Sequence, residues 1–198
     1  MPRRPTRVVP TVLLAEQLPA GSWLNWLADR LTAAGREVRL CPAGAELDPG
    51  AWRDELIRTM VGLPDDDFDL VAHSAGCLLW LHHAALTDAA EPPAELPRPA
   101  RVALIAPPAA SAAPPGLEAF YPVPLQIDAV RRGAEGTVLV GSDGDPRCPA
   151  GVAAEYGTPL KMATTVVPGA GGFTAADGYA EWPAVLDWCG RANLAFIA

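Results

Sequence analysis

The chain has 198 residues, of which 50% are apolar and 19% are charged, and its formal net charge is −8. This length suits one domain with a sizeable core, and the composition is that of a globular protein, not of a disordered or fibrous one. The negative charge disfavours a nucleic-acid partner, because the phosphates would be repelled.

The N-terminal segment places Arg3, Arg4 and Arg7 before an apolar run. This combination resembles a signal peptide, but Pro10 interrupts the run, and the same apolar residues suit a first buried strand. No other apolar run approaches the length needed to span a membrane. We therefore expect a cytoplasmic protein with no membrane partner, in which residues 1–7 form a flexible tail. The abundance of Ala, Pro, Gly and Arg is typical of a GC-rich bacterial source.

Short apolar runs alternate with helical patterns along most of the chain. Strands are predicted at residues 8–15, 37–41, 70–72, 102–105, 137–140 and 164–167. These runs are apolar at nearly every position, as in strands buried on both faces. Helices are predicted at residues 23–34, 51–61, 76–86, 150–156 and 182–192. The alternation predicts a single α/β domain over residues 1–198, with a mainly parallel sheet and helices on both faces.

A Pro-rich loop is predicted at residues 106–126, after the fourth strand. Its apolar residues Phe120, Tyr121, Val123 and Leu125 have two interpretations. They form an apolar lid over a site at the strand ends, or they belong to a surface loop that buries its aromatic residues against the body of the protein.

The segment AHSAG, residues 72–76, differs from the nucleophile-elbow pattern G-x-S-x-G only in having Ala72 at the first glycine position. Small residues are needed because the serine of an elbow lies on a cramped strand-to-helix turn, and alanine is the mildest departure. We therefore predict Ser74 as a nucleophile whose hydroxyl is exposed at the sheet edge. The Ala75 amide, at the start of the next helix, would stabilise negative charge on a bound oxygen.

A candidate acid follows in the loop GSDGDPRCP, residues 141–149. Asp143 and Asp145 come directly after a predicted strand, where an elbow-type site carries the carboxylate that orients its histidine. Asp-Gly and Asp-Pro also occur in ordinary turns, so the spacing by itself leaves both residues as candidates.

Cysteine and histidine spacings do not indicate a metal site. The three histidines and the widely spaced cysteines form no C-x-x-C or H-x-x-x-H pattern, so we expect no metal ion. A core of this size does not need disulfides, which favours reduced thiols in a cytoplasmic chain. The cysteines are Cys41, Cys77, Cys148 and Cys189.

Four segments together resemble the small serine hydrolases of the retinoblastoma-binding-protein and bacterial YdeN type, a compact branch of the α/β-hydrolase fold. They are LVAHSAGCLL at the elbow, VALIAPPA at the next strand, GSDGDPRCP at the acid loop and PGAGGFTAADGYAEWP near the C-terminus. The resemblance implies an α/β-hydrolase fold and esterase-like chemistry on a small, apolar or acyl-bearing molecule, without a cofactor. It also implies Asp145, rather than Asp143, as the catalytic acid.

The C-terminal segment departs from the family pattern, which resembles P-G-A-G-H-I-N-x-x-S-G-x-x-x-W-P. Gly172 stands at the position of the histidine, and Thr174 and Asp177 replace the asparagine and the serine. Because three positions differ, this is a remodelled loop rather than one point substitution.

The loop after the first strand departs as well. It lacks the family's Pro-Gly, and Ser22-Trp23 stands in place of His-Trp. A backbone amide of Ala15 or Glu16 remains available as an oxyanion donor, because that role needs an N–H group rather than a particular side chain.

Other histidines do not replace the missing one in this prediction. His82 and His83 lie on the helix that follows Ser74, roughly 12 Å or more along its axis. His73 adjoins Ser74 and is expected to line the site, but neighbouring residues around a sharp turn project in different directions.

Three functions remain open from the sequence. The first is weak or residual acyl hydrolysis by Ser74 and Asp145. The second is a non-hydrolytic enzyme, such as a cyclase, lyase or isomerase, in which Asp145, Asp143 or Asp177 transfers protons in an apolar pocket enlarged by Gly172. The third is a non-catalytic relative that binds a ligand or a protein. The sequence indicates no oligomeric state.

Overall fold

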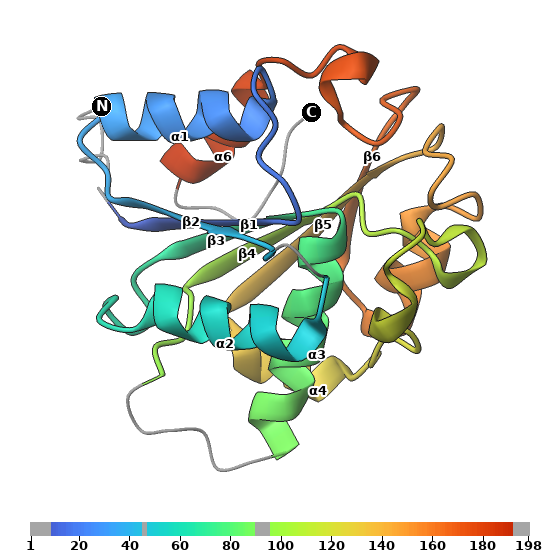
Figure 1. Cartoon of the computed structure of the whole chain (residues 1–198), viewed down its shortest axis with the longest axis horizontal. Coiled ribbons are helices and arrows are strands. Elements are labelled where there is room, and N and C mark those ends of the chain that lie inside the picture. The colour runs from blue at the N-terminus through green and yellow to red at the C-terminus, as the bar shows by residue number, and fades with distance from the viewer. Residues whose placement is uncertain (1–8, 45–46, 90–95, 192–198) are drawn as a thin grey trace, which may run out of the picture.

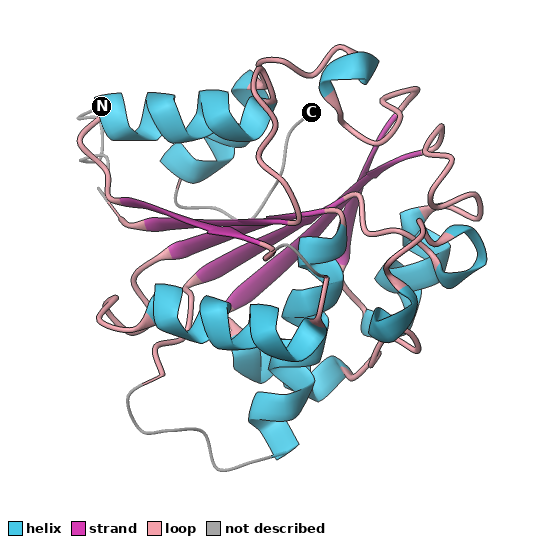
Figure 2. Ribbon diagram, viewed as in Figure 1, coloured by secondary structure: helices cyan, strands magenta, loops and turns pink. Residues whose placement is uncertain are grey.

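The computed structural model describes residues 9–44, 47–89 and 96–191, and the tail expected at residues 1–7 lies outside them. Strands and helices alternate along the chain (Figure 1, Figure 2). The strands are β1 Thr11–Ala15, β2 Val38–Pro42, β3 Asp69–His73, β4 Arg101–Ile105, β5 Gly136–Ser142 and β6 Ala163–Val167. The helices are α1 Trp23–Ala33, α2 Pro49–Met60, α3 Ala75–Ala89, α4 Ile127–Gly133, α5 Thr158–Leu160 and α6 Pro183–Gly190.

The six strands form one sheet in the order β2-β1-β3-β4-β5-β6, and every neighbouring pair is parallel. Helices α1 and α6 cover one face, and α2, α3 and α4 cover the other (Figure 1). The predicted fold class is therefore confirmed. Because all the strands run in one direction, the residues that follow them meet at a single edge of the sheet.

Two hydrophobic cores flank the sheet, since alternate residues of each strand point to opposite faces. In β1, Leu14 packs with the α2, α3 and α4 side, whereas Leu13 packs with the α1 and α6 side. All four cysteines are buried free thiols. The strands are thus covered on both faces, as their nearly continuous apolar sequences predict.

The structure differs from the predicted elements on either side of β5. Helix α4 was not predicted, because only Ala129 and Val130 are buried in its seven residues and so short an apolar stripe gives no clear period. The helix predicted at residues 150–156 is instead a π-helical turn at Ala153–Gly157 followed by α5. Pro159 has no N–H for the regular helical hydrogen bond, so a continuous α-helix is disfavoured there.

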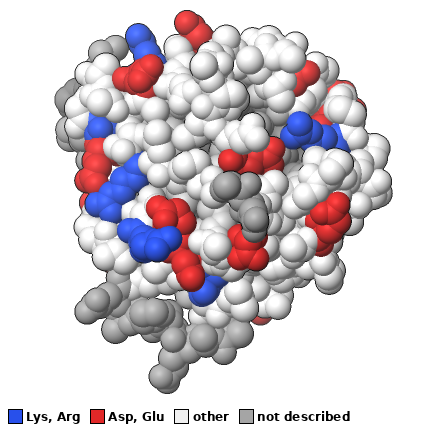
Figure 3. Space-filling view, in the orientation of Figure 1, with Lys and Arg blue, Asp and Glu red and all other residues white. Residues whose placement is uncertain are grey.

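Charged side chains lie interspersed with uncharged ones on the face shown in Figure 3, rather than gathered in one patch. In the three described ranges, no helix is both long and apolar enough to cross a membrane.

Candidate active site

The elbow is a sharp turn between β3 and α3. Ser74 has a left-handed backbone, with φ of 53°, its N–H donates to the Ile105 carbonyl at 3.0 Å, and its carbonyl accepts from Cys77 N–H at 3.0 Å. Gly76 is required because a Cβ at that position would lie 2.3 Å from the Leu14 carbonyl oxygen. A strained non-glycine residue held between a strand and a helix is the backbone geometry of a nucleophile elbow.

The sequence predicts that the Ser74 hydroxyl is exposed at the sheet edge. In the structure, however, Ser74 is buried and only 3% exposed. The contact that sequence reasoning missed is with Arg147, whose Nη1 donates to Ser74 Oγ at 3.3 Å. Arg147 lies two residues beyond Asp145 in the same loop, and that closeness is the one sequence signal that could have drawn attention to it. A guanidinium stays protonated in proteins, so it cannot take the proton of Ser74.

Asp145 follows β5 and is 3% exposed. Its Oδ1 accepts from the Arg147 backbone N–H at 2.9 Å, whereas its Oδ2 is buried with no hydrogen-bond partner among the described residues. Burial raises the pKa of the Asp145 carboxyl. Asp143 has a turn role instead, because its Oδ1 accepts from Gly169 N–H at 2.7 Å. The geometry thus separates two carboxylates that the sequence left as alternatives.

Gly172 lies beside this carboxylate. A Cβ at Gly172 would lie 3.7 Å from Asp145 Oδ1, 3.8 Å from Thr174 Cγ2 and 3.9 Å from Asp177 Oδ2, all ordinary van der Waals distances. The backbone of Gly172 is not left-handed, so a side chain is sterically acceptable there. A residue larger than glycine would therefore begin beside the Asp145 carboxylate, next to the oxygen that accepts from Arg147 N–H.

Asp177 holds the loop around Gly172. Its Oδ2 accepts from Gly172 N–H at 3.1 Å, from Thr174 N–H at 3.0 Å and from the Thr174 hydroxyl at 2.7 Å. These donors lower the pKa of Asp177. The bonds account for the Thr174 and Asp177 replacements in the sequence as a capping box, and they make Asp177 a structural residue rather than a free acid or base.

None of the three histidines is directed at Ser74. Nε2 of His73 lies 3.0 Å from the Gly172 carbonyl oxygen, and burial lowers the pKa of His73 to about 4. Nε2 of His82 lies 2.7 Å from the Phe120 carbonyl oxygen. His83 is buried against Trp80, with a ring-centroid distance of 5.4 Å. As the sequence predicts, the later histidines point elsewhere, and His73 contacts the loop of Gly172 instead of the nucleophile.

The candidate oxyanion donors lie in the elbow itself and at the end of the neighbouring strand β1. Ala75 is the first residue of α3, and Ala15, at the end of β1, is in parallel register with His73. Glu16 directly follows Ala15. These positions suit donation from the backbone amides of Ala75 and of Ala15 or Glu16, and this role stays a prediction.

The aromatic residues of the loop after β4 lie against the body of the protein. Phe120 is completely buried against Trp52 and His82, with ring centroids 6.1 Å and 6.2 Å away. The hydroxyl of Tyr121 donates to the Pro108 carbonyl at 2.9 Å. Phe120 is therefore part of the core, and the half-buried Tyr121 packs against it. This arrangement favours the second interpretation of the loop sequence, because the buried Phe120 cannot line an open lid.

The elbow, the acid loop and the order of strands define an α/β-hydrolase. In agreement with them, a family model described as serine hydrolase matches residues 16–190. The chain therefore belongs to the serine hydrolase family. Among described residues, no group of three or more His, Cys, Asp or Glu side chains is placed to hold a metal ion.

Solved structures show the same fold. The ydeN gene product of B. subtilis has a TM-score of 0.69 and 19% identity, over 90% of this chain and 95% of that one. A YdeN-like hydrolase from Pectobacterium atrosepticum has a TM-score of 0.65 and 18% identity, over 91% and 88%. A thioesterase domain from the curacin biosynthetic pathway has a TM-score of 0.58 and 14% identity, over 91% and 90%. No curated protein sequence matches the chain.

Proposed function

We propose that this member of the serine hydrolase family has an incomplete catalytic triad and that its acyl hydrolysis is weak or lost. The observation that carries the proposal is the hydrogen bond from Arg147 to Ser74. A cation that cannot accept a proton contacts the nucleophile, while all three histidines are engaged elsewhere. The ligand is a small molecule that is apolar or carries an acyl group.

The remaining groups support a limited rate. In serine proteases, a site that lacks one triad member still accelerates the reaction about 10³- to 10⁴-fold over its rate in water. That remaining rate enhancement comes from the oxyanion hole and from substrate binding. Ser74, Asp145 and the Ala75 amide are the residues that would supply such residual catalysis. Without a base, the Ser74 hydroxyl stays protonated and is a poor nucleophile at neutral pH.

Labelling with a fluorophosphonate probe tests this proposal, because the probe reacts with activated serines. The wild type is expected to label slowly or not at all, and Ser74→Ala fixes the background. Rapid labelling that is lost in Ser74→Ala would show an activated serine and overturn the proposal. A fully active family member, assayed beside it, shows that the probe is competent.

A second candidate function rests on Asp145. A buried carboxyl with a raised pKa and a free oxygen suits proton transfer in a non-hydrolytic reaction, such as a cyclisation, elimination or isomerisation. In that case, turnover of the ligand would survive Ser74→Ala and be lost in Asp145→Asn. Weak acyl hydrolysis would instead be lost in Ser74→Ala.

A further inference from the structure

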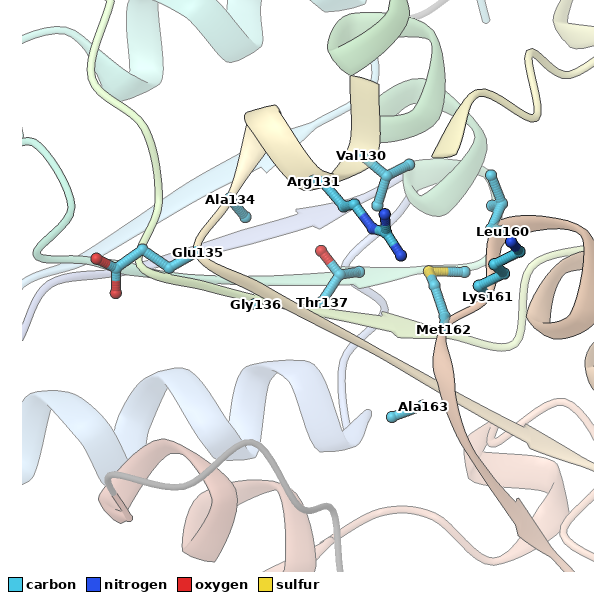
Figure 4. Close-up of a pocket in the computed structure, with 10 residues that line it drawn as sticks. All are labelled: Val130, Arg131, Ala134, Glu135, Gly136, Thr137, Leu160, Lys161, Met162 and Ala163. Atoms are coloured by element: carbon cyan, nitrogen blue, oxygen red, sulfur yellow. The ribbon is translucent and has the colours of Figure 1, made fainter. Parts of the chain in front are cut away.

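A second cluster of polar groups lies at the amino end of β5. An open pocket of about 150 Å³ lies there between the end of α4, the start of β5 and the turn from α5 into β6 (Figure 4). Thr137 is in register with Val102 of β4, which is in register with Leu70 of β3. Ser74 lies four residues beyond Leu70, roughly 13 Å further along the strand direction, so the pocket is separate from the elbow.

Two cations line this pocket, Arg131 and Lys161. Within the described part of the chain, neither side chain has an ion-pair partner. Glu135 also lines the pocket, but its carboxylate is directed away from Arg131 in Figure 4. Its charge also acts on Arg98, whose pKa it helps to raise. The pocket therefore has a local excess of positive charge in a chain whose net charge is −8.

An unsatisfied hydroxyl lies among these cations. Thr137 Oγ1 is buried and has no hydrogen-bond partner in the described residues. Buried polar atoms are nearly always paired, so this hydroxyl has an unused capacity to donate or accept a hydrogen bond. The Arg131 guanidinium extends into the space next to Thr137 and Met162 (Figure 4). A hydroxyl beside two cations suits a ligand that accepts hydrogen bonds.

Lys161 is unusual in both composition and conformation. It is the only lysine of the chain, in which the other 14 residues of the Lys and Arg total are arginine. It follows α5 with a left-handed backbone, φ 51° and ψ 42°, where glycine is the ordinary residue. Lys161 lines the pocket, and in Figure 4 its side chain extends beside Leu160 at the pocket edge. Strain of this kind is a recognised mark of functional positions.

We propose that this pocket binds a small oxyanion, inorganic phosphate or the phosphate of a monoester, between Arg131 and Lys161. The Thr137 hydroxyl donates a third hydrogen bond. Arg131 offers a planar fork of donors and Lys161 a point charge, a pairing suited to phosphate oxygens. The apolar walls, Val130, Leu160 and Met162, shield the anion from water on one side and so strengthen these bonds. This site does not depend on the proposed function of Ser74.

A phosphate titration followed by NMR tests the proposal. Incorporation of [15N]lysine gives a single lysine amide signal, that of Lys161, and [15N]methionine places a second reporter at Met162 in the same pocket. Inorganic phosphate is expected to shift both signals saturably, and chloride at the same ionic strength is not. Removing one cation, as in Arg131→Gln or Lys161→Gly, should weaken the affinity about tenfold, because each charge-assisted hydrogen bond contributes on that scale.

The variants include their own checks of folding. Glycine suits the left-handed backbone at position 161, so Lys161→Gly should have a melting temperature at or above that of the wild type. Lys161→Gln removes the charge without relieving the backbone strain. Arg30→Gln, on α1 at the opposite face of the sheet, should bind phosphate as the wild type does. The proposal is overturned if phosphate produces no saturable shift, if chloride reproduces it, or if the affinity is unchanged in all three pocket variants.

Discussion

Arg147 donates a hydrogen bond to the hydroxyl of Ser74, so the side chain in contact with the elbow serine is a cation and not a base. The same arginine gives its backbone N–H to Asp145. One residue thus contacts both candidate catalytic groups, and no imidazole lies between them.

Replacing Arg147 tests whether it restrains Ser74. In Arg147→Ala the hydroxyl loses a donor worth about 1 kcal/mol and becomes more accessible, so fluorophosphonate labelling is expected to be about fivefold faster. The measurement is the labelling rate by intact-protein mass spectrometry, with Arg30→Ala as a matched surface control. Slower labelling in Arg147→Ala would mean that the cation activates the serine instead.

Restoring an imidazole should restore hydrolysis. In Gly172→His the new side chain begins 3.7 Å from Asp145 Oδ1, and a positioned general base contributes about 10²-fold or more. We expect a gain of that size in p-nitrophenyl acetate hydrolysis. Gly172→Ala adds a Cβ without a base and should show no gain.

The gain in hydrolysis in Gly172→His is informative only if it depends on Ser74. The double variant Gly172→His/Ser74→Ala should return to background. If Gly172→His is folded and still shows no gain, the oxyanion loop after β1 has diverged too far to support acyl transfer.

Asp145→Asn should make the protein more stable at neutral pH. Burial holds the pKa of Asp145 above the ordinary aspartate value of about 3.9, so the folded state keeps the proton where the unfolded chain has released it. The protonated carboxyl adds stability below that value, and this contribution is lost as the pH rises through the raised pKa. The melting temperature of the variant should therefore exceed that of the wild type at pH 7, with the difference shrinking toward pH 3.

Asp143→Asn is the matched control, because Asp143 is exposed and bonded to Gly169 N–H. It should show no such gain. A lower melting temperature of Asp145→Asn at pH 7 would indicate that the carboxylate has a stabilising partner in solution.

The ion pair of Asp69 and Arg101 should be a major source of stability. Nε of Arg101 lies 2.9 Å from Asp69 Oδ1, the Asp69 side chain is 2% exposed, and the guanidinium also stacks on Trp188, 4.5 Å from the ring centroid. Arg101→Met removes the guanidinium and should cost about 3–5 kcal/mol in urea unfolding. Arg101→Met/Asp69→Leu removes both charges and should recover much of the loss. An unchanged unfolding midpoint in the single variant would contradict this role.

All four thiols should be unreactive in the folded protein. Burial raises the pKa of Cys41 and Cys148 to about 11 and that of Cys189 to about 12, and it raises the pKa of Cys77 as well. Because the thiolate is the reactive form, Ellman's reagent at pH 8 should detect no thiol in the native protein and all four in denaturant. Rapid reaction of one native thiol would show that its segment opens.

The sequence predicted the sheet and the elbow because both are local signals. A strand buried on both faces needs a continuous apolar run, and the turn at Ser74 needs small neighbours such as Gly76. Arg147 was not predicted as a site residue, because the direction of a long side chain in a loop depends on its rotamer and not on its spacing. Phe120 was open to two interpretations for a similar reason, since an aromatic residue in a loop suits a lid and a core equally well.

The loop that carries Gly172 is held without using a side chain at that position. Neighbouring side chains form hydrogen bonds with its backbone atoms. Asp177 accepts from the Gly172 N–H, and His73 Nε2 contacts the Gly172 carbonyl oxygen. Trp23 Nε1 donates to the Phe173 carbonyl at 2.9 Å. The backbone at position 172 is thus held by contacts that need no side chain there. A library of substitutions there would sample new chemistry beside Asp145 at little cost in folding, which makes this protein a practical scaffold for installing catalytic groups.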